Sequence, residues 1–174
     1  TLDAVLTDDP DNPAHANLKA AALGRIGGYD EAIALYAELV ERFPGHARLW
    51  MSYGHMLKTV GRQEDSIAAY RRGLDAEPGL GEIWWSLANL KTIRFDEADR
   101  QAMEGALAAA EPAGAERDDD RLHLHFALGK AYDDAGAPDA AFRHYAAGNA
   151  IRAGQLGYDA AETSAIVDAA IATC

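Results

Sequence analysis

Proline, glycine and tyrosine recur at corresponding positions of the sequence every 34 residues. Proline returns at positions 10, 44 and 78, and the same interval relates Gly27 to Gly61 and Tyr36 to Tyr70. Within each interval, apolar residues recur at helical spacing on both sides of a glycine, which predicts two short amphipathic helices joined by a tight turn. Such a unit cannot bury its apolar side alone, so units of this length must stack on one another. The repeat therefore predicts an all-α fold built from stacked helix pairs.

The unit from Ala47 to Leu80 shows the pattern most clearly. Gly54, Tyr70 and Pro78 stand at the small, aromatic and terminal positions that are typical of tetratricopeptide repeat (TPR) proteins. The chain resembles this family. The resemblance implies a right-handed superhelical solenoid of antiparallel helix pairs that ends in a C-terminal capping helix, because the open end of an array must be covered.

The period divides residues 1–174, which we interpret as a single TPR domain, into successive segments. They are the end of a preceding repeat (1–12), repeat 1 (13–46), repeat 2 (47–80), an irregular repeat 3 (81–120), repeat 4 (121–156) and a capping or linker helix (157–174). Because the chain begins with Thr1 and with what reads as half a repeat, we interpret it as a piece of a longer protein.

Repeat 3 departs from the pattern because Phe95 stands where the turn glycine is expected. After it we predict a polar helix from about residue 96 to residue 110, with Met103 and Leu107 facing inward, and then an acidic loop over residues 115–120. In the last segment we expect Ile166, Ala169 and Ala170 to face the end of the solenoid.

The chain is strongly acidic, with a formal net charge of −12. This balance opposes binding to nucleic acids, where Lys and Arg must replace counterions, and to anionic membrane surfaces. No apolar run is long enough for a membrane span, and no signal peptide is visible. The single cysteine, Cys174, can form neither an internal disulfide nor a metal cluster, so we expect a reducing cytoplasm.

No motif in the sequence indicates a catalytic centre, a cofactor or a metal. His123 and His125 are two residues apart and point to different sides of a helix, so they cannot chelate one ion together. The run from Asp118 to Asp120 lacks the glycine and the distal glutamate of a calcium loop, and is better interpreted as a solvated loop that caps the next helix. Phosphate-binding and nucleophile-elbow motifs are absent.

The remaining candidate site is the concave groove, which the first helix of each repeat lines in a stacked array. The residues predicted to bind there are Asn17, Arg48, Met51, His55, Lys58, Trp85, Asn89, Phe126 and Lys130. Trp84 and Trp85 are adjacent, so they cannot both face the core; Trp84 falls on the packing stripe, which leaves Trp85 for the groove as an aromatic anchor. The alternative is that these residues only pack along the seams between repeats.

Two runs carry a closer resemblance. WWSLANLKTIRF (Trp84 to Phe95) and DRLHLHFALGKAYDDAGAPDAAFRHYAAGNAIR (Asp120 to Arg152) are similar to the N-terminal half of bacterial TPR–sulfotransferase fusion proteins. The run from Tyr158 to Ile171 resembles the linker helix of that family. The resemblance implies a catalytic domain after Cys174 that holds the sulfonate donor, and implies that residues 1–174 are not an enzyme by themselves.

These observations favour a non-catalytic module that binds a protein or peptide in its groove, or contacts an adjoining catalytic domain, as the accessory part of a sulfotransferase-like protein. The alternative is a freestanding scaffold or chaperone-like adaptor that captures acidic tails with Arg48, Lys58, Asn89 and Lys130. A purely structural spacer is the third possibility. Neither nucleic acid nor membrane is an expected partner, and the sequence does not indicate an oligomeric state.

Overall fold

The predicted all-α solenoid is confirmed. The computed structural model describes residues 12–156 and 160–172, and their regular secondary structure is entirely helical. The helices are α2 (Pro13–Arg25), α3 (Tyr29–Arg42), α4 (Ala47–Thr59), α5 (Gln63–Ala76), α6 (Gly81–Ala88), α7 (Glu97–Ala110), the 3-10 helix η1 (Glu111–Arg117), α8 (Asp118–Asp134), α9 (Pro138–Leu156) and α10 (Ala160–Ala172). The expected end of a preceding repeat and Cys174 lie outside the described residues, apart from Asn12.

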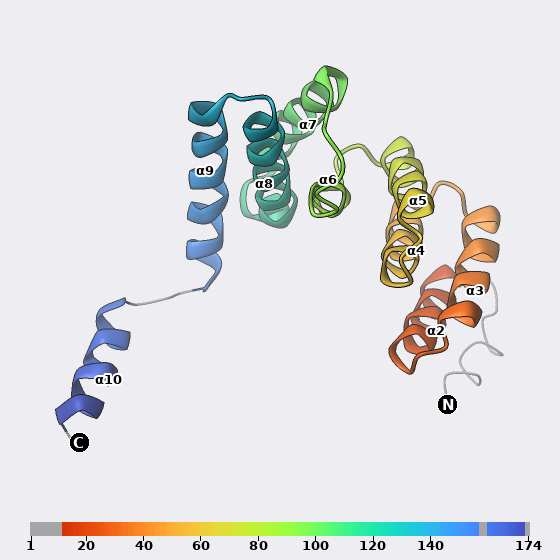
Figure 1. Cartoon of the computed structure of the whole chain (residues 1–174), viewed down its shortest axis with the longest axis horizontal. Coiled ribbons are helices and arrows are strands. Elements are labelled where there is room, and N and C mark those ends of the chain that lie inside the picture. Colours follow the sequence, from red (N-terminus) through yellow and green to blue (C-terminus); the bar gives the residue numbers. More distant parts are fainter. Residues whose placement is uncertain (1–11, 157–159, 173–174) are drawn as a thin grey trace.

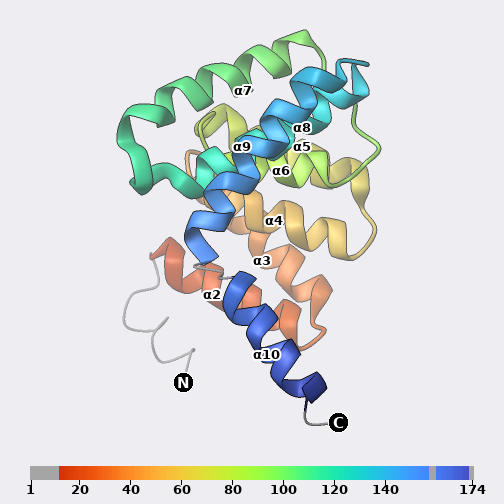
Figure 2. The same cartoon turned by 90° about the vertical axis from the view of Figure 1, so that its left-hand side faces the viewer.

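Three regular helix pairs form the array. They are α2 with α3, α4 with α5 and α8 with α9, and they follow one another along an arc (Figure 1). The view turned by 90° shows α2 to α9 stacked across one another rather than in a single bundle (Figure 2). None of the described helices is long and apolar enough to cross a membrane.

The turns inside these pairs depend on glycine. Gly27, Gly61 and Gly136 have φ angles of 90°, 80° and 73°, which side chains with a Cβ rarely adopt. Each glycine follows the last turn of the first helix and lets the chain reverse into the second. The glycine turns predicted for repeats 1, 2 and 4 are therefore confirmed.

A small residue facing a tyrosine brings the two helices of a pair together. A Cβ added at Gly54 would lie 2.5 Å from Cε1 of Tyr70, and one added at Gly129 would lie 2.5 Å from Cε1 of Tyr145. In both pairs the tyrosine ring occupies the space that a side chain on the first helix would need. The close contact is local to one repeat, which is why the sequence pattern reports it.

Repeat 3 breaks this arrangement. Its first helix, α6, packs mainly against α8 of the next repeat, and α7 packs against α8 as well. The side chain of Asp120 accepts a hydrogen bond from the backbone N of Gly81 at 2.9 Å, so α8 caps the start of α6. The predicted acidic loop is wrong: residues 111–117 form η1, and α8 already begins at Asp118.

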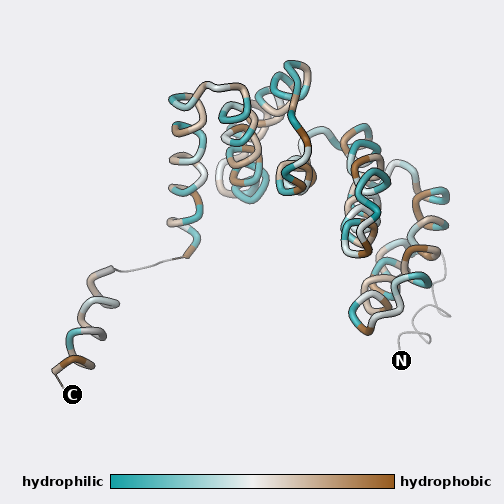
Figure 3. The backbone as a smooth tube through the Cα atoms, in the orientation of Figure 1, coloured by the Kyte–Doolittle hydropathy of each residue, from teal (hydrophilic) through white to brown (hydrophobic). Residues whose placement is uncertain are grey.

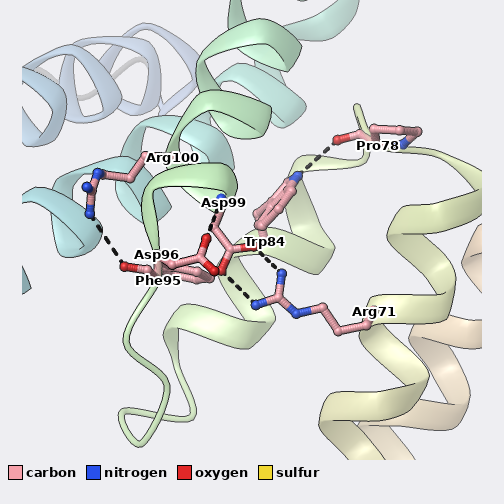
Figure 4. A network of polar contacts seen from close by, with 7 residues as sticks. All are labelled: Arg71, Pro78, Trp84, Phe95, Asp96, Asp99 and Arg100. Atoms are coloured by element: carbon pink, nitrogen blue, oxygen red, sulfur yellow. Dashed lines mark hydrogen bonds and ion pairs between the residues drawn. The ribbon is translucent and has the colours of Figure 1, made fainter.

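A polar network holds α7 against α5 and α6 (Figure 4). The guanidinium of Arg71 on α5 donates to both carboxylate oxygens of Asp99 on α7, with an Nη2–Oδ2 distance of 2.8 Å. Arg71 also lies 5.8 Å from the ring centre of Trp84. Asp96 accepts from the backbone N of Asp99 at 2.9 Å, which caps α7 at its predicted start. Met103 and Leu107 face inward as predicted, with 0% and 8% of their surfaces exposed.

A helix forms in the predicted capping segment, but it does not cover the end of the array. α10 lies beyond residues 157–159 and apart from α9 (Figure 1). The predicted inward placement of Ala169 and Ala170 is wrong, because both are exposed. The side chain of Ile166 is outside the described part. The outward face of α9 is therefore open in this arrangement.

Candidate interaction surface

The first helices of the repeats lie next to one another. α2 contacts α4, α6 contacts α8, and Nε2 of His55 on α4 shares a hydrogen bond of 3.0 Å with Oγ of Ser86 on α6. We call α2, α4, α6 and α8 the first-helix layer. The residues predicted for the groove lie on these four helices, apart from Asn89, which is the C-cap of α6.

An aromatic pair joins α6 and α8 of this layer. The ring centres of Trp85 on α6 and Phe126 on α8 are 5.4 Å apart, and Phe126 lies 6.3 Å from Tyr145 on α9. Trp85 is half-buried, with part of its ring packed on the central hydrophobic cluster. Trp84 is 3% exposed and belongs to that cluster. The two adjacent tryptophans thus divide between the core and the layer surface, as their positions on the helix predict.

His55 lines a cleft between α2 and α4. The cleft has a volume of about 360 Å³, and its wall is formed by Ala21, Gly24, Arg25, Tyr29, Tyr36, Ser52, His55, Met56 and Thr59. The polar side chains of this wall carry hydroxyl, guanidinium or imidazole groups, and none is a carboxylate. The cleft therefore offers hydrogen-bond donors, although the protein as a whole is acidic. Asn17 lies on α2, where its backbone carbonyl accepts from Oη of Tyr36 at 3.5 Å. Met51 is 8% exposed and belongs to the central cluster rather than to an open groove.

A second, smaller cleft lies where α4, α6 and α8 begin. Its volume is about 210 Å³, and it is lined by Arg48, Leu80, Glu82, Glu116, Asp119, Asp120 and His123. Arg48 therefore faces several carboxylates of its own chain. A negatively charged ligand would have to displace this arrangement, whereas a cationic side chain would complement it.

The remaining basic groups are not gathered around Arg48. Nζ of Lys130 contacts the carboxylate of Asp134 and lies 3.4 Å from the carbonyl oxygen of Ile93. Lys58 is exposed in the last turn of α4, and Asn89 is exposed at the end of α6. The structure thus places these residues on three different helices without forming a common carboxylate-binding site among the described residues.

A histidine pair that no sequence motif predicts joins α8 and α9. Nδ1 of His125 on α8 and Nδ1 of His144 on α9 are 3.1 Å apart, and the ring of Tyr132 stacks on His144 with centres 5.5 Å apart. The hydroxyl of Tyr132 donates to the carboxylate of Glu104 on α7. His125 and His144 belong to different helices and are 19 positions apart, so no short sequence motif relates them.

The acidic run at the start of α8 has structural partners. Asp118 pairs with Arg121 at 2.7 Å, and Asp120 pairs with Arg117 at 2.6 Å in addition to capping α6. These contacts orient the first turn of α8, where negative charge is favoured by the helix dipole. In the described part of the chain, no group of three or more His, Cys, Asp or Glu side chains is arranged to hold a metal ion.

Acid is expected to destabilise the protein through three half-buried histidines, His55, His125 and His144. Burial lowers the pKa of His55, His125 and His144 below the ordinary value of 6.5, and the charge that His144 acquires lowers that of His125 further. The unfolded chain therefore binds protons at a higher pH than the folded chain, so stability is greatest above 6.5 and falls as the pH drops below it. Urea unfolding between about pH 7.5 and about pH 5.5 measures this loss.

The substitution His144→Asn is expected to make that pH dependence shallower, because one of the two facing imidazoles is removed. His46→Asn is the matched control, since His46 is exposed at the start of α4. Equal pH slopes for wild type and His144→Asn would contradict the assignment.

Comparisons with known proteins agree with this architecture. A tetratricopeptide repeat family model matches residues 47–79. No curated protein sequence matches the chain. A crystal structure of MamA is similar over 90% of this chain and 88% of that chain, with a TM-score of 0.59 and 16% identity. A crystal structure of BtubC from P. vanneervenii is similar over 84% of this chain and 65% of that chain, with a TM-score of 0.61 and 20% identity. At these identities the likeness concerns the fold.

Proposed function

We propose that this solenoid, with its tetratricopeptide repeat at residues 47–79, is a non-catalytic scaffold that binds a protein segment along the first-helix layer. The observation that carries the proposal is the half-buried pair of Trp85 and Phe126, which presents aromatic surface on α6 and α8 of the layer. A few residues contribute most of the binding energy in many protein interfaces, and tryptophan is enriched among them because a partner can bury its large side chain completely.

The layer suits an extended segment or a helix that makes several separate contacts. The aromatic pair provides an apolar anchor, and the cleft beside His55 accepts a side chain with hydrogen-bonding groups. The cleft around Arg48 favours a cationic side chain, because Glu82, Glu116 and Asp119 face it. We therefore expect a partner with basic and apolar residues, which differs from the acidic tails that the sequence alone also allowed.

Selection from a random peptide library tests the proposal. The full chain is expected to enrich peptides that combine basic and apolar residues, and Trp85→Ala is expected to weaken their binding by at least about tenfold through loss of the anchor. Affinities are measured by titration calorimetry. Because Trp85 also packs on the central cluster, the melting temperature of each variant is recorded alongside.

Val60→Ala is the matched control, since Val60 is an exposed apolar residue in the turn after α4. Binding that survives Trp85→Ala and Phe126→Ala in folded protein would contradict the assignment of the site. Enrichment of acidic peptides would instead support the adaptor alternative.

We further propose, from the resemblance of residues 84–95 and 120–152, that the gene product continues into a sulfotransferase-like domain. These runs form α6, its connection to α7, and α8 and α9. The intact mass of the natural product, with peptide coverage past Cys174, tests this. A continuation that contains a phosphate-binding loop would support the proposal, and a product that ends near Cys174 would contradict it. A cytoplasmic location stays a prediction from the single cysteine.

A further inference from the structure

Each regular helix pair has a tyrosine at the same position of its second helix, and the exposure of this tyrosine differs between the pairs. Tyr36 and Tyr70 are 2% and 0% exposed, because the first helix of the following repeat covers them. Tyr145 holds the same position in the last pair, yet its side chain is partly exposed. The surface that a following helix would cover is therefore present on α9 but open.

Exposed apolar residues extend along this surface of α9. Phe142 and Leu156 are 72% and 67% exposed. In α5 the residue equivalent to Phe142 is Ile67, three positions before the tyrosine, and Ile67 packs against the central cluster. Residues spaced alternately by four and three positions form one stripe on a helix. The exposed stripe on α9 consists of Phe142, Ala146, Asn149, Ala153 and Leu156.

α10 is the helix of this chain that suits the stripe. Its sequence, AAETSAIVDAAIA, consists of Ala, Ile and Val apart from four polar residues. Ile171 is 70% exposed, and the ends of both α9 and α10 are coloured as hydrophobic in Figure 3. Small and apolar residues of this kind allow close helix packing, and leaving them in water on both helices is unfavourable.

The charges of the two helices are complementary. The charged residues of α9 are Asp139, Arg143 and Arg152, and the two arginines are exposed on either side of the apolar stripe. The charged residues of α10 are Glu162 and Asp168. In a chain with a net charge of −12, α9 is thus a helix with an excess of arginine beside its apolar face.

We propose that two copies of this chain associate by exchanging α10, so that α10 of each copy packs on the apolar stripe of α9 of the other. In the structure α10 lies apart from its own α9, which leaves both surfaces accessible to a second molecule (Figure 1). The exchange is reciprocal, so two α9–α10 contacts related by a two-fold axis cover the exposed α9 stripes of both copies.

Light scattering coupled to gel filtration tests the exchange on the full chain, over a wide range of concentration. The expected species at high concentration is a dimer of the 18.6 kDa chain. Phe142→Glu and Ile171→Glu are each expected to raise the dimer dissociation constant by at least about a hundredfold, because each change alters two symmetric apolar contacts. Ile26→Glu is the control, since Ile26 is 82% exposed but lies between α2 and α3. All three positions are exposed, so the variants are expected to retain wild-type circular dichroism; Ala146→Glu, on the same α9 stripe, replaces Phe142→Glu if that variant does not.

Mixing the two defective variants distinguishes exchange of α10 between copies from packing of α10 on α9 of its own chain. The Phe142→Glu copy keeps an intact α10, and the Ile171→Glu copy keeps an intact stripe, so their mixture is expected to recover dimer that neither forms alone. Wild type that stays monomeric would overturn the proposal, and so would dimers that persist in both variants. A monomer whose melting temperature falls with Ile171→Glu would show that α10 covers its own α9, which also overturns it.

Discussion

Gly81→Ala is expected to lower the free energy of unfolding by about 3 kcal/mol, although only one methyl group is added. A Cβ at this position would lie 2.3 Å from the carbonyl oxygen of Asp120 and 2.9 Å from its Cα. These are backbone atoms at the start of α8, so no side-chain rotation relieves the contact. The helices must separate, and the hydrogen bond from the Gly81 backbone to the Asp120 carboxylate is lost with them.

Urea unfolding followed by circular dichroism measures this change. Gly105→Ala is the matched control, because a Cβ at Gly105 meets no atom within 4 Å. Gly105 lies inside α7, where alanine is expected to raise stability by up to about 1 kcal/mol. If Gly81→Ala were as stable as wild type, the close packing of α6 on α8 would be wrong.

Trp84→Ala is expected to destabilise the protein by about 3–5 kcal/mol, which is the cost of removing a large aromatic side chain from a core. Trp84 is 3% exposed, lies edge-on to Phe95 at 6.0 Å, and donates from Nε1 to the carbonyl oxygen of Pro78 at 2.9 Å. Trp84→Phe keeps an aromatic ring but loses the hydrogen bond, so a smaller loss of about 1–2 kcal/mol is expected.

Trp50 provides a control within the same protein. It lies one period earlier and makes the equivalent hydrogen bond, from Nε1 to the carbonyl oxygen of Pro44 at 2.9 Å. Trp50 is only half-buried, so Trp50→Ala removes less buried surface and is expected to cost less than Trp84→Ala. Equal losses at the two positions, measured by the same urea titration, would contradict the assignment of Trp84 as the central core residue.

The sequence predicts the regular helix pairs because their contacts are short-range. Gly54 meets Tyr70 within one repeat, and the intervening turn is set by Gly61 with its positive φ. The pair needs a small residue opposite the tyrosine and a glycine at the turn, each at a fixed position in the repeat. These residue types therefore recur with the 34-residue period and can be recognised in the sequence. Repeat 3 lacks the turn glycine, and the break at Phe95 is predicted for the same reason.

What replaces the regular pair in repeat 3 depends on contacts between distant segments. The fit of Gly81 against Asp120 and the ion pair of Arg71 with Asp99 each join different helices. Helical periodicity reports which side of a helix is apolar, but it does not identify the partner helix. For this reason the sequence predicts a loop at the start of α8 and does not predict the pairing of α6 with α8.

In the candidate site, too, the features that depend on local helix geometry are predicted from the sequence, and those that depend on distant segments are not. The separation of Trp84 from Trp85 follows from helix geometry and is confirmed by their burial. The surroundings of Arg48 come from η1 and α8, which periodicity places less well, so its acidic cleft was not predicted. The i, i+4 spacing of Lys130 and Asp134 was visible in the sequence and indicates an ion pair rather than a free cation.

The division of the buried residues into two hydrophobic clusters bears on how unfolding spreads through the array. In a regular solenoid each repeat touches only its neighbours, so stability is a sum of nearest-neighbour terms and units are lost one at a time from the ends. Here α8 contacts α6, α7 and α9, and Arg71 joins α5 directly to α7. The central hydrophobic cluster joins α4, α5, α6, α7 and α8, whereas α2 and α3 share a separate, smaller cluster with α4, so α2 and α3 are expected to open first.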